Sequence, residues 1–291
     1  MQPLNWDHRP AGLRAPALIC AFRGWNDAGE AASAAVSFFS TALEGKRFAW
    51  TDAEQFFDYQ ATRPRVKLVE GVTREIVWPC VEIFEAPVPR APRDLVLLVG
   101  PEPSLHWRSF SGLVVDLAEA LGVQMVVTVG ALLAEVPHSH AVPMTGLASD
   151  PALVERLGLK PSSYEGPTGM IGVLHSKCAE AGFPAVSLWA SVPHYVAAAP
   201  NPKAALALLR KLEGLVGVSV DASELERAAG DYERQVGLAV QSDPDVQAFV
   251  ERLEQAAESE EETLSAEELP SGDIIAREFQ RFLRQRGGEM S

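Results

Sequence analysis

The chain has 291 residues, a formal net charge of −14 at pH 7 and a hydrophobic content of 47%. This length and hydrophobicity can build one large domain with a buried core, together with a smaller region. An acidic chain repels phosphate backbones, so the charge argues against nucleic acid as a partner. No apolar stretch reaches the length of a membrane span and no apolar leader opens the sequence. We therefore expect a soluble, cytoplasmic protein that does not bind membranes.

A buried strand is predicted at residues 17–22, followed by the turn Gly24-Trp25-Asn26-Asp27-Ala28-Gly29 and an alanine-rich helix. Asn26 or Asp27 can cap that helix. In an open α/β sheet, ligands or partners bind at such strand ends. Backbone N–H groups at the start of the helix can also hold an anion. An ordinary capped turn between a strand and a helix is the alternative.

Apolar runs then alternate with helical patterns up to about residue 200. Strands are predicted at 94–99, 124–133 and 185–190, with helices at 110–121 and 172–181. This alternation is typical of parallel βαβ units in a doubly wound α/β fold.

Between residues 50 and 87 the pattern changes. Three short strands, at 66–68, 75–78 and 81–84, follow one another without helices between them. They predict antiparallel pairing, and hence a mixed, mostly parallel sheet.

We divide the chain into an α/β domain at residues 1–215 and a helical C-terminal extension at 216–291. Asp243-Pro244 supplies a cap and a first-turn proline for one helix of the extension. A further helix is expected at 275–283. Residues 258–268 are strongly acidic, which indicates a solvated face or a mobile linker, with docking of a basic partner as the alternative.

The three cysteines, Cys20, Cys80 and Cys178, lie in apolar segments. Their number and spacing match neither a disulfide framework nor a metal-binding motif. We expect buried, reduced thiols, no metal site and no cofactor.

Two predicted strands run into the similar segments Ala134-Glu135-Val136-Pro137-His138 and Ala190-Ser191-Val192-Pro193-His194. If these strands are parallel neighbours, His138 and His194 lie at the same edge of the sheet. Histidine there can act as a general base or bind an anion. Similar turns whose histidines hydrogen-bond to backbone carbonyl groups are the alternative.

A third loop, Tyr164-Glu165-Gly166-Pro167-Thr168-Gly169, precedes a predicted helix and is expected at the same edge. We expect Trp25, Tyr164 and Trp189 to pack within the protein rather than to stack on a ligand. No catalytic residue is assigned. The candidate pocket or contact site comprises Asn26, Asp27, His138, Glu165, Thr168 and His194.

These loops also carry a family resemblance, together with Gly100-Pro101-Glu102-Pro103, Thr145-Gly146-Leu147-Ala148-Ser149-Asp150 and Leu269-Pro270-Ser271-Gly272-Asp273. The chain resembles the proteasome assembly chaperone 2 family over nearly its whole length, and within it the actinobacterial branch of unestablished function. The resemblance implies a three-layer phosphorylase/hydrolase-like fold with a C-terminal helical region. It also implies self-association, with a trimer as one form, and a proteasome-related protein partner.

Nucleoside phosphorylases share this fold, so an enzyme is an alternative. Glu165 lies where those enzymes carry a glutamate, but the following strand ends in Ser191-Val192-Pro193-His194 without their proton-donating aspartate. Loss of a general acid lowers the reaction rate about 10²–10⁴-fold. We therefore favour an interaction or assembly factor over a phosphorylase- or hydrolase-like enzyme. A small-molecule binding module that uses the same loops is the third hypothesis.

Overall fold

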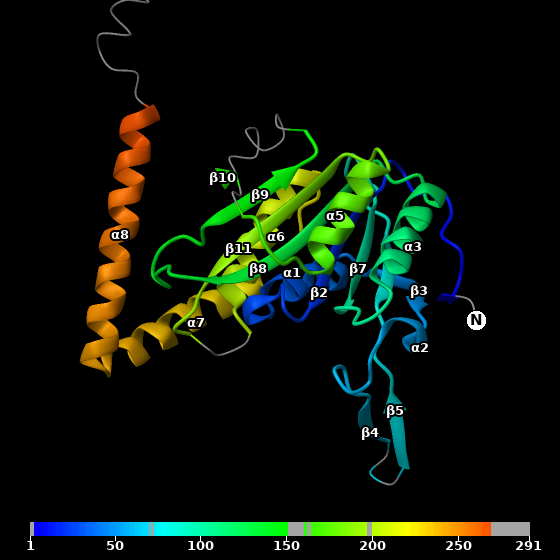
Figure 1. Ribbon diagram of the computed structural model, residues 1–291, viewed down its shortest axis with the longest axis horizontal. Coiled ribbons are helices and arrows are strands. Elements are labelled where there is room, and N and C mark those ends of the chain that lie inside the picture. Colours follow the sequence, from blue (N-terminus) through cyan, green and yellow to red (C-terminus); the bar gives the residue numbers. More distant parts are fainter. Residues whose placement is uncertain are drawn as a thin grey trace, which may run out of the picture. The chain divides into compact units, whose positions relative to one another are not determined.

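The computed structural model describes residues 3–69, 71, 73–150, 160–161, 164–196 and 200–268. They belong to two compact units, which meet in the sequence between Leu238 and Ala239. The first unit contains a nine-stranded sheet in the order β1-β3-β6-β7-β2-β8-β11-β9-β10, and a separate two-stranded ribbon (Figure 1).

Four parallel strands form the centre of the sheet: β7 (Leu95–Pro101), β2 (Ala17–Arg23), β8 (Met125–Ala134) and β11 (Ala185–Pro193). They correspond to the apolar runs of the sequence, whose residues are almost all buried. Such continuous apolar runs are typical of strands that are covered on both faces. The predicted βαβ arrangement is confirmed.

Antiparallel strands extend the sheet at both sides, which confirms the predicted mixed sheet. On one side, β6 (Glu82–Ala86) pairs with β7, followed by β3 (Lys46–Thr51) and β1 (Leu4–Trp6). On the other side, β9 (Met144–Ala148) pairs antiparallel with β11, and β10 (Lys160–Pro161) runs parallel to β9.

The ribbon departs from the sequence prediction. β4 (Arg65–Val69) and β5 (Thr73–Val77) pair only with each other and do not join the main sheet. Every residue of both strands is exposed. A strand in the main sheet would need an apolar face against a helix layer, and no described residue of the unit covers the ribbon in that way.

Helices cover both faces of the main sheet and give three layers (Figure 1). A short turn of helix (Ala28–Glu30), α1 (Ala31–Ala42) and α6 (Pro202–Val216) lie on one face, against side chains such as Ile19. On the other face, α3 (Trp107–Ala120) and α5 (Met170–Glu180) pack against the side chains that alternate with those. The predicted three-layer α/β fold is therefore confirmed.

The helix α2 (Ala53–Phe56) follows β3. Cys20 and Cys178 are buried as predicted, whereas Cys80 is only half-buried, and burial raises the pKa of the Cys178 thiol to about 12. Among the described helices, none combines the length and apolarity needed to cross a bilayer.

The C-terminal region is helical as far as it is described, with α7 (Ser223–Gln241) and α8 (Pro244–Glu268). Asp243 caps α8 as predicted, because its Oδ1 accepts hydrogen bonds from the backbone N–H groups of Asp245 (3.0 Å) and Val246 (3.3 Å). The acidic segment is part of α8. The helix expected at 275–283 lies outside the described residues, and the domain boundary at residue 216 stays a prediction.

Asp94 joins the N-terminal segment to the start of β7. Its buried carboxylate accepts hydrogen bonds from the backbone N–H groups of Arg14 (2.7 Å) and Val88 (2.8 Å), and from the Arg14 guanidinium (2.8 Å). Burial alone would raise the pKa of Asp94. The three donors outweigh burial and hold that pKa below its ordinary value.

We predict that Asp94→Asn lowers the free energy of unfolding by about 1–3 kcal/mol, because an amide cannot accept all of these hydrogen bonds. Since the folded-state pKa is the lower one, the stabilisation is fully present above about pH 4. It is lost as pH falls through the folded-state pKa. Urea unfolding of both proteins across this pH range measures the effect. Equal stability of wild type and variant at pH 7 would contradict this role of Asp94.

Candidate functional site

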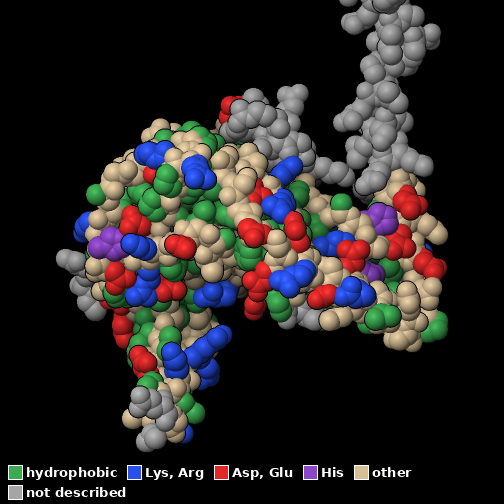
Figure 2. Space-filling model, turned by 180° about the vertical axis from the view of Figure 1, so that it is seen from behind, with side chains coloured by type: hydrophobic (Ala, Val, Ile, Leu, Met, Phe, Trp, Pro, Cys, Tyr) green, Lys and Arg blue, Asp and Glu red, His purple; other side chains and the backbone are tan. Residues whose placement is uncertain are grey.

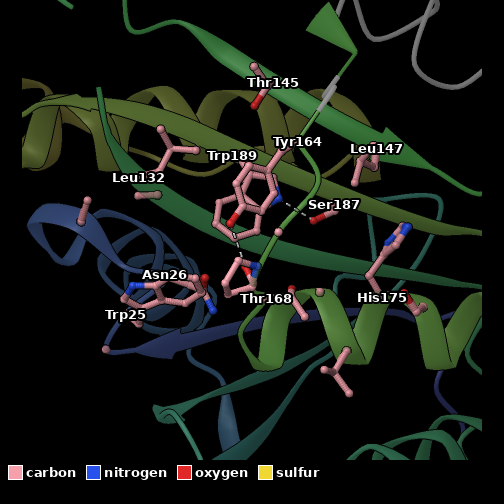
Figure 3. A pocket seen from close by; sticks show the side chains of 18 of the residues that line it. Trp25, Asn26, Leu132, Thr145, Leu147, Tyr164, Thr168, His175, Ser187 and Trp189 are labelled. Atoms are coloured by element: carbon pink, nitrogen blue, oxygen red, sulfur yellow. Dashed lines mark hydrogen bonds between the residues drawn. The ribbon is translucent and has the colours of Figure 1, made fainter. Parts of the chain in front are cut away.

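A cleft of about 1380 Å³ lies over the carboxyl-terminal half of β8 and over Ser187 and Trp189 of β11, beside α5 (Figure 3). The loop after β2, residues of β9 and the loop before α5 complete its walls. Small-molecule pockets are usually about 300–1,000 Å³, so this cleft is large. The side chains labelled in Figure 3 are Trp25, Asn26, Leu132, Thr145, Leu147, Tyr164, Thr168, His175, Ser187 and Trp189.

Asp27 does not line the cleft but caps α1, as the sequence predicts. Its carboxylate accepts hydrogen bonds from the backbone N–H groups of Ala32 (2.8 Å) and Ser33 (3.2 Å), and from the Ser33 hydroxyl (2.5 Å). Burial is the main cause of a raised pKa for Asp27. Its carboxylate occupies the N–H groups that could otherwise hold an anion at this helix start.

Glu102, in the loop after β7, caps the start of α5. Its Oε1 accepts hydrogen bonds from the backbone N–H of Met170 (2.7 Å) and from Nδ2 of the buried Asn26 (3.1 Å). Gly169 fits closely here, because a Cβ at this position would lie 1.8 Å from Nδ2 of Asn26. Glu102 therefore fixes the loop after β2 and the start of α5 relative to each other. A glutamate directly after a predicted strand is visible in the sequence, but the helix that it caps is not.

We predict that Glu102→Ala lowers the free energy of unfolding by about 1–2 kcal/mol, because the first N–H of α5 and the Asn26 amide lose their acceptor. Glu102→Gln is the matched control and should lose less, since its side-chain carbonyl can still accept. Thermal unfolding of the three proteins tests this order of stability. The proposed role of Glu102 is wrong if the alanine variant has the same melting temperature as the wild type.

His138 and His194 lie on either side of Tyr195, at the edge of the sheet where the sequence places them. The Nδ1 atom of His138 lies 2.8 Å from the Tyr195 hydroxyl, and the backbone N–H of His138 donates to the same hydroxyl (2.7 Å). The Nδ1 atom of His194 lies 3.2 Å from the Ala134 carbonyl oxygen. Only His194 lines the cleft, because His138 faces a separate cavity of about 10 Å³.

The loop before α5 is divided between the cleft and the surface. Thr168 lines the cleft, as do Tyr164 and Gly166, but Glu165 between them is exposed and is not part of the lining. Of the six candidate residues, the cleft thus brings together Asn26, Thr168 and His194. Asp27, His138 and Glu165 are not part of its lining.

The expectation that all three aromatic side chains serve packing is wrong for two of them. Trp25 and Tyr164 are 65% and 67% exposed and stand at the mouth of the cleft. Trp189 is half-buried, and its Nε1–H donates to the Ser187 hydroxyl (2.9 Å). Its indole lies against Gly130, where a Cβ would come within 2.6 Å of the ring. The first two rings belong to loops, which the helices do not cover.

His175 is a cleft residue that the sequence does not single out. It lies on α5, and its Nδ1 atom is buried without a hydrogen-bond partner among the described residues. Burial lowers the pKa of this imidazole. Nothing in the spacing of the predicted helix distinguishes His175 from a surface residue, because its burial depends on the cleft.

We predict that His175 titrates below about pH 6.5, the value of an unhindered histidine. Because the folded state favours the neutral imidazole, stability falls as pH drops from about 6.5 and levels off below the folded-state pKa. NMR titration of the histidine resonances measures the pKa, and His175→Gln assigns the signal and removes this part of the pH dependence. A His175 pKa at or above the ordinary value would contradict the burial argument.

Within the described part of the chain, no three His, Cys, Asp or Glu side chains come together in a group that could hold a metal ion. The cleft lining combines apolar surface and aromatic rings with polar groups that include Arg108, Lys177 and Glu180. This chemistry suits binding, either of a protein segment or of a largely apolar molecule.

Comparison with known proteins agrees with the fold. The PAC2 family profile matches residues 21–240. The crystal structure of a PAC2 family protein from Streptomyces avermitilis covers 81% of this chain and 99% of its own, at 47% identity and a TM-score of 0.75. A proteasome-assembly chaperone homologue from Mycobacterium tuberculosis covers 80% and 99%, at 41% identity and a TM-score of 0.75.

A Mycobacterium tuberculosis protein of unknown function has a TM-score of 0.84 at 25% identity, over 92% of this chain and 94% of its own. Among curated proteins, no sequence matches this chain. The resemblance seen in the sequence is thus confirmed at the level of the family. Because the profile covers most of the chain and two solved structures are at least 41% identical to it over at least 80% of its length, the chain belongs to the PAC2 family.

Proposed function

We propose that this chain is a cytoplasmic, self-associating protein-interaction or assembly factor whose partner is a proteasome-related protein. The relative from Mycobacterium tuberculosis, 41% identical, is described as a proteasome-assembly chaperone homologue. That likeness is the observation on which the proposal rests. A trimer is one form that the self-association can take.

The polar groups around the cleft support binding rather than catalysis. Asp27 and Glu102 hydrogen-bond to helix N-termini, and His194 lies against a backbone carbonyl oxygen. Glu165, which the enzyme hypothesis requires beside the substrate, is exposed outside the cleft lining. A general acid or base must reach the reacting atom directly or through one water molecule.

Exposed apolar side chains support the same proposal. At the cleft mouth, Trp25, Leu133 and Tyr164 are 60–67% exposed, and Leu132 and Leu147 about 40%. Contiguous exposed apolar surface on a protein usually marks an interaction site.

We predict that the tagged chain, purified from its own host, enriches proteasome α or β subunits. An unrelated tagged protein of similar size and negative charge is the matched control, because a chain of net charge −14 attracts basic proteins nonspecifically. Mass spectrometry of both samples measures the enrichment. In the reciprocal experiment, a tagged α subunit should recover this chain. Absence of proteasome subunits above the control in both directions would overturn the proposed partner.

A further inference from the structure

Two polar side chains, Ser187 of β11 and His175 of α5, form what we call the cleft floor. Ser187 is 1% exposed, and its Oγ accepts the hydrogen bond from Nε1 of Trp189 (2.9 Å). A serine hydroxyl can also donate one hydrogen bond, and no described residue accepts it. Because buried polar groups are nearly always hydrogen-bonded, this hydroxyl points to an acceptor from outside the chain.

Two further buried polar atoms beside Ser187 have unused hydrogen-bonding capacity. The His175 ring projects from α5 toward the strands that carry Ser187 and Leu147 (Figure 3), and its Nδ1 has no partner among the described residues. Thr128 lies opposite Ser187 in the register of β8 and β11, is fully buried, and has no described partner for its Oγ1. The α5 side of the sheet thus gathers three such groups in one place.

The surroundings of the cleft floor are uncharged. Within the sheet, Ser187 lies between Thr128 and Leu147, its register partners on β8 and β9. Burial lowers the pKa of the His175 imidazole, so this side chain is neutral at pH 7. A charged group buried among neutral neighbours carries a large desolvation cost. The cleft floor therefore favours an uncharged polar group.

The charged residues of the lining, Arg108, Lys177 and Glu180, are exposed. Lys177 is also paired with a carboxylate, because its Nζ lies 3.4 Å from Oε2 of Glu180. Figure 2 shows Lys, Arg, Asp and Glu side chains interspersed on the other side of the molecule, so exposed charges are a general feature of this surface. Since water and salt screen exposed charges, these three contribute less to binding than a buried hydrogen bond does.

Rings and leucines adjoin the cleft floor. The indole of Trp189 rests on Gly130, where a Cβ would come within 2.6 Å of the ring, so only glycine permits this placement. The half-buried ring also lines the cleft, as do Leu132 and Leu147, which are about 40% exposed. A planar aromatic molecule can bury its faces against such a wall without leaving polar groups unpaired.

We propose that the cleft floor binds an uncharged aromatic amide, whose carbonyl oxygen accepts from the Ser187 hydroxyl and whose N–H donates to Nδ1 of His175. A neutral imidazole accepts at Nδ1 when its proton is on Nε2. An amide supplies the required acceptor and donor from adjacent atoms, and its aromatic body lies along Trp189. This site depends neither on self-association nor on the proteasome-related partner proposed above.

Two probes with the same ring system test the polar group of the ligand. 2-Naphthamide carries an uncharged amide, and 2-naphthoate carries a carboxylate at the same position. We expect 2-naphthamide to bind the wild type more tightly, because the cleft floor offers no partner for a charge. NMR titrations that follow the tryptophan indole N–H resonances give both dissociation constants. Trp189→Phe identifies the resonance of Trp189, which should shift on binding.

Two substitutions each remove one of the proposed hydrogen bonds. Ser187→Ala and His175→Phe should each weaken 2-naphthamide binding about 2–10-fold, the range for one hydrogen bond between neutral groups. His175→Phe leaves the bond between Ser187 and Trp189 intact, so it tests the site independently of the indole. Ser109→Ala, at an exposed serine of α3 outside the lining, is the matched control and should bind like the wild type. Circular dichroism checks the fold of each variant.

Three outcomes would overturn the proposal. Tighter binding of 2-naphthoate, weakened by Arg108→Gln, would assign the ligand to the exposed cations. No binding of 2-naphthamide to the folded wild type at millimolar concentration would mean that water alone satisfies the cleft floor. Equal affinity of the wild type, Ser187→Ala and His175→Phe would exclude the assigned contacts. Because none of these measurements involves the oligomeric state or proteasome subunits, this proposal and the proposed function can fail separately.

Discussion

Four parallel strands, β7, β2, β8 and β11, are buried on both faces along most of their length, and this burial determines where the rest of the molecule can place polar groups. Loops that leave these strands at their carboxyl ends must provide partners for the N–H groups of the helices that follow. Asp27 and Glu102 do so for α1 and α5. The cleft is lined by the groups near these strand ends that do not cap a helix.

The same two carboxylates change what the strand ends can bind. In many α/β proteins the N-terminus of the helix that follows a strand holds the anionic part of a ligand. Here carboxylates of the chain itself fill that position at both helices. The cleft lining itself presents the indole of Trp189, the leucines of β8, the imidazole of His175 and the cations Arg108 and Lys177. At these two helix starts, the N–H groups of Ala32 and Met170 are therefore not available to an anionic ligand.

Much of the fold follows from local sequence signals. The apolar runs of β2, β7, β8 and β11 and the stripe of Phe110 and Leu117 on α3 predict buried elements, because continuous or periodic apolar residues must face a core. The residues of the site are predicted less well from the sequence. His138 and His194 meet at one edge as expected, yet only one of them lines the cleft. Glu102 and His175 acquire their surroundings only from tertiary contacts, which neither spacing nor residue type reveals.

The ribbon also shows that local sequence signals do not reveal tertiary contacts. Its alternating apolar and charged residues predict strands correctly, but alternation alone does not say which face, or which molecule, will cover the apolar side chains. Strands with one apolar face are ordinarily assigned to the nearest sheet. In this chain the exposure of every residue of β4 and β5 excludes that assignment.

The position of the ribbon in the sheet has an evolutionary consequence. It leaves after β3 and returns at β6, and these two strands are antiparallel neighbours held in register by their own pairing. The entropy of closing such an excursion grows only slowly with its length. Insertions, deletions or replacement of the ribbon would thus leave the register of the sheet unchanged. Natural selection can therefore vary the length and side chains of this ribbon without changing the sheet that carries the cleft.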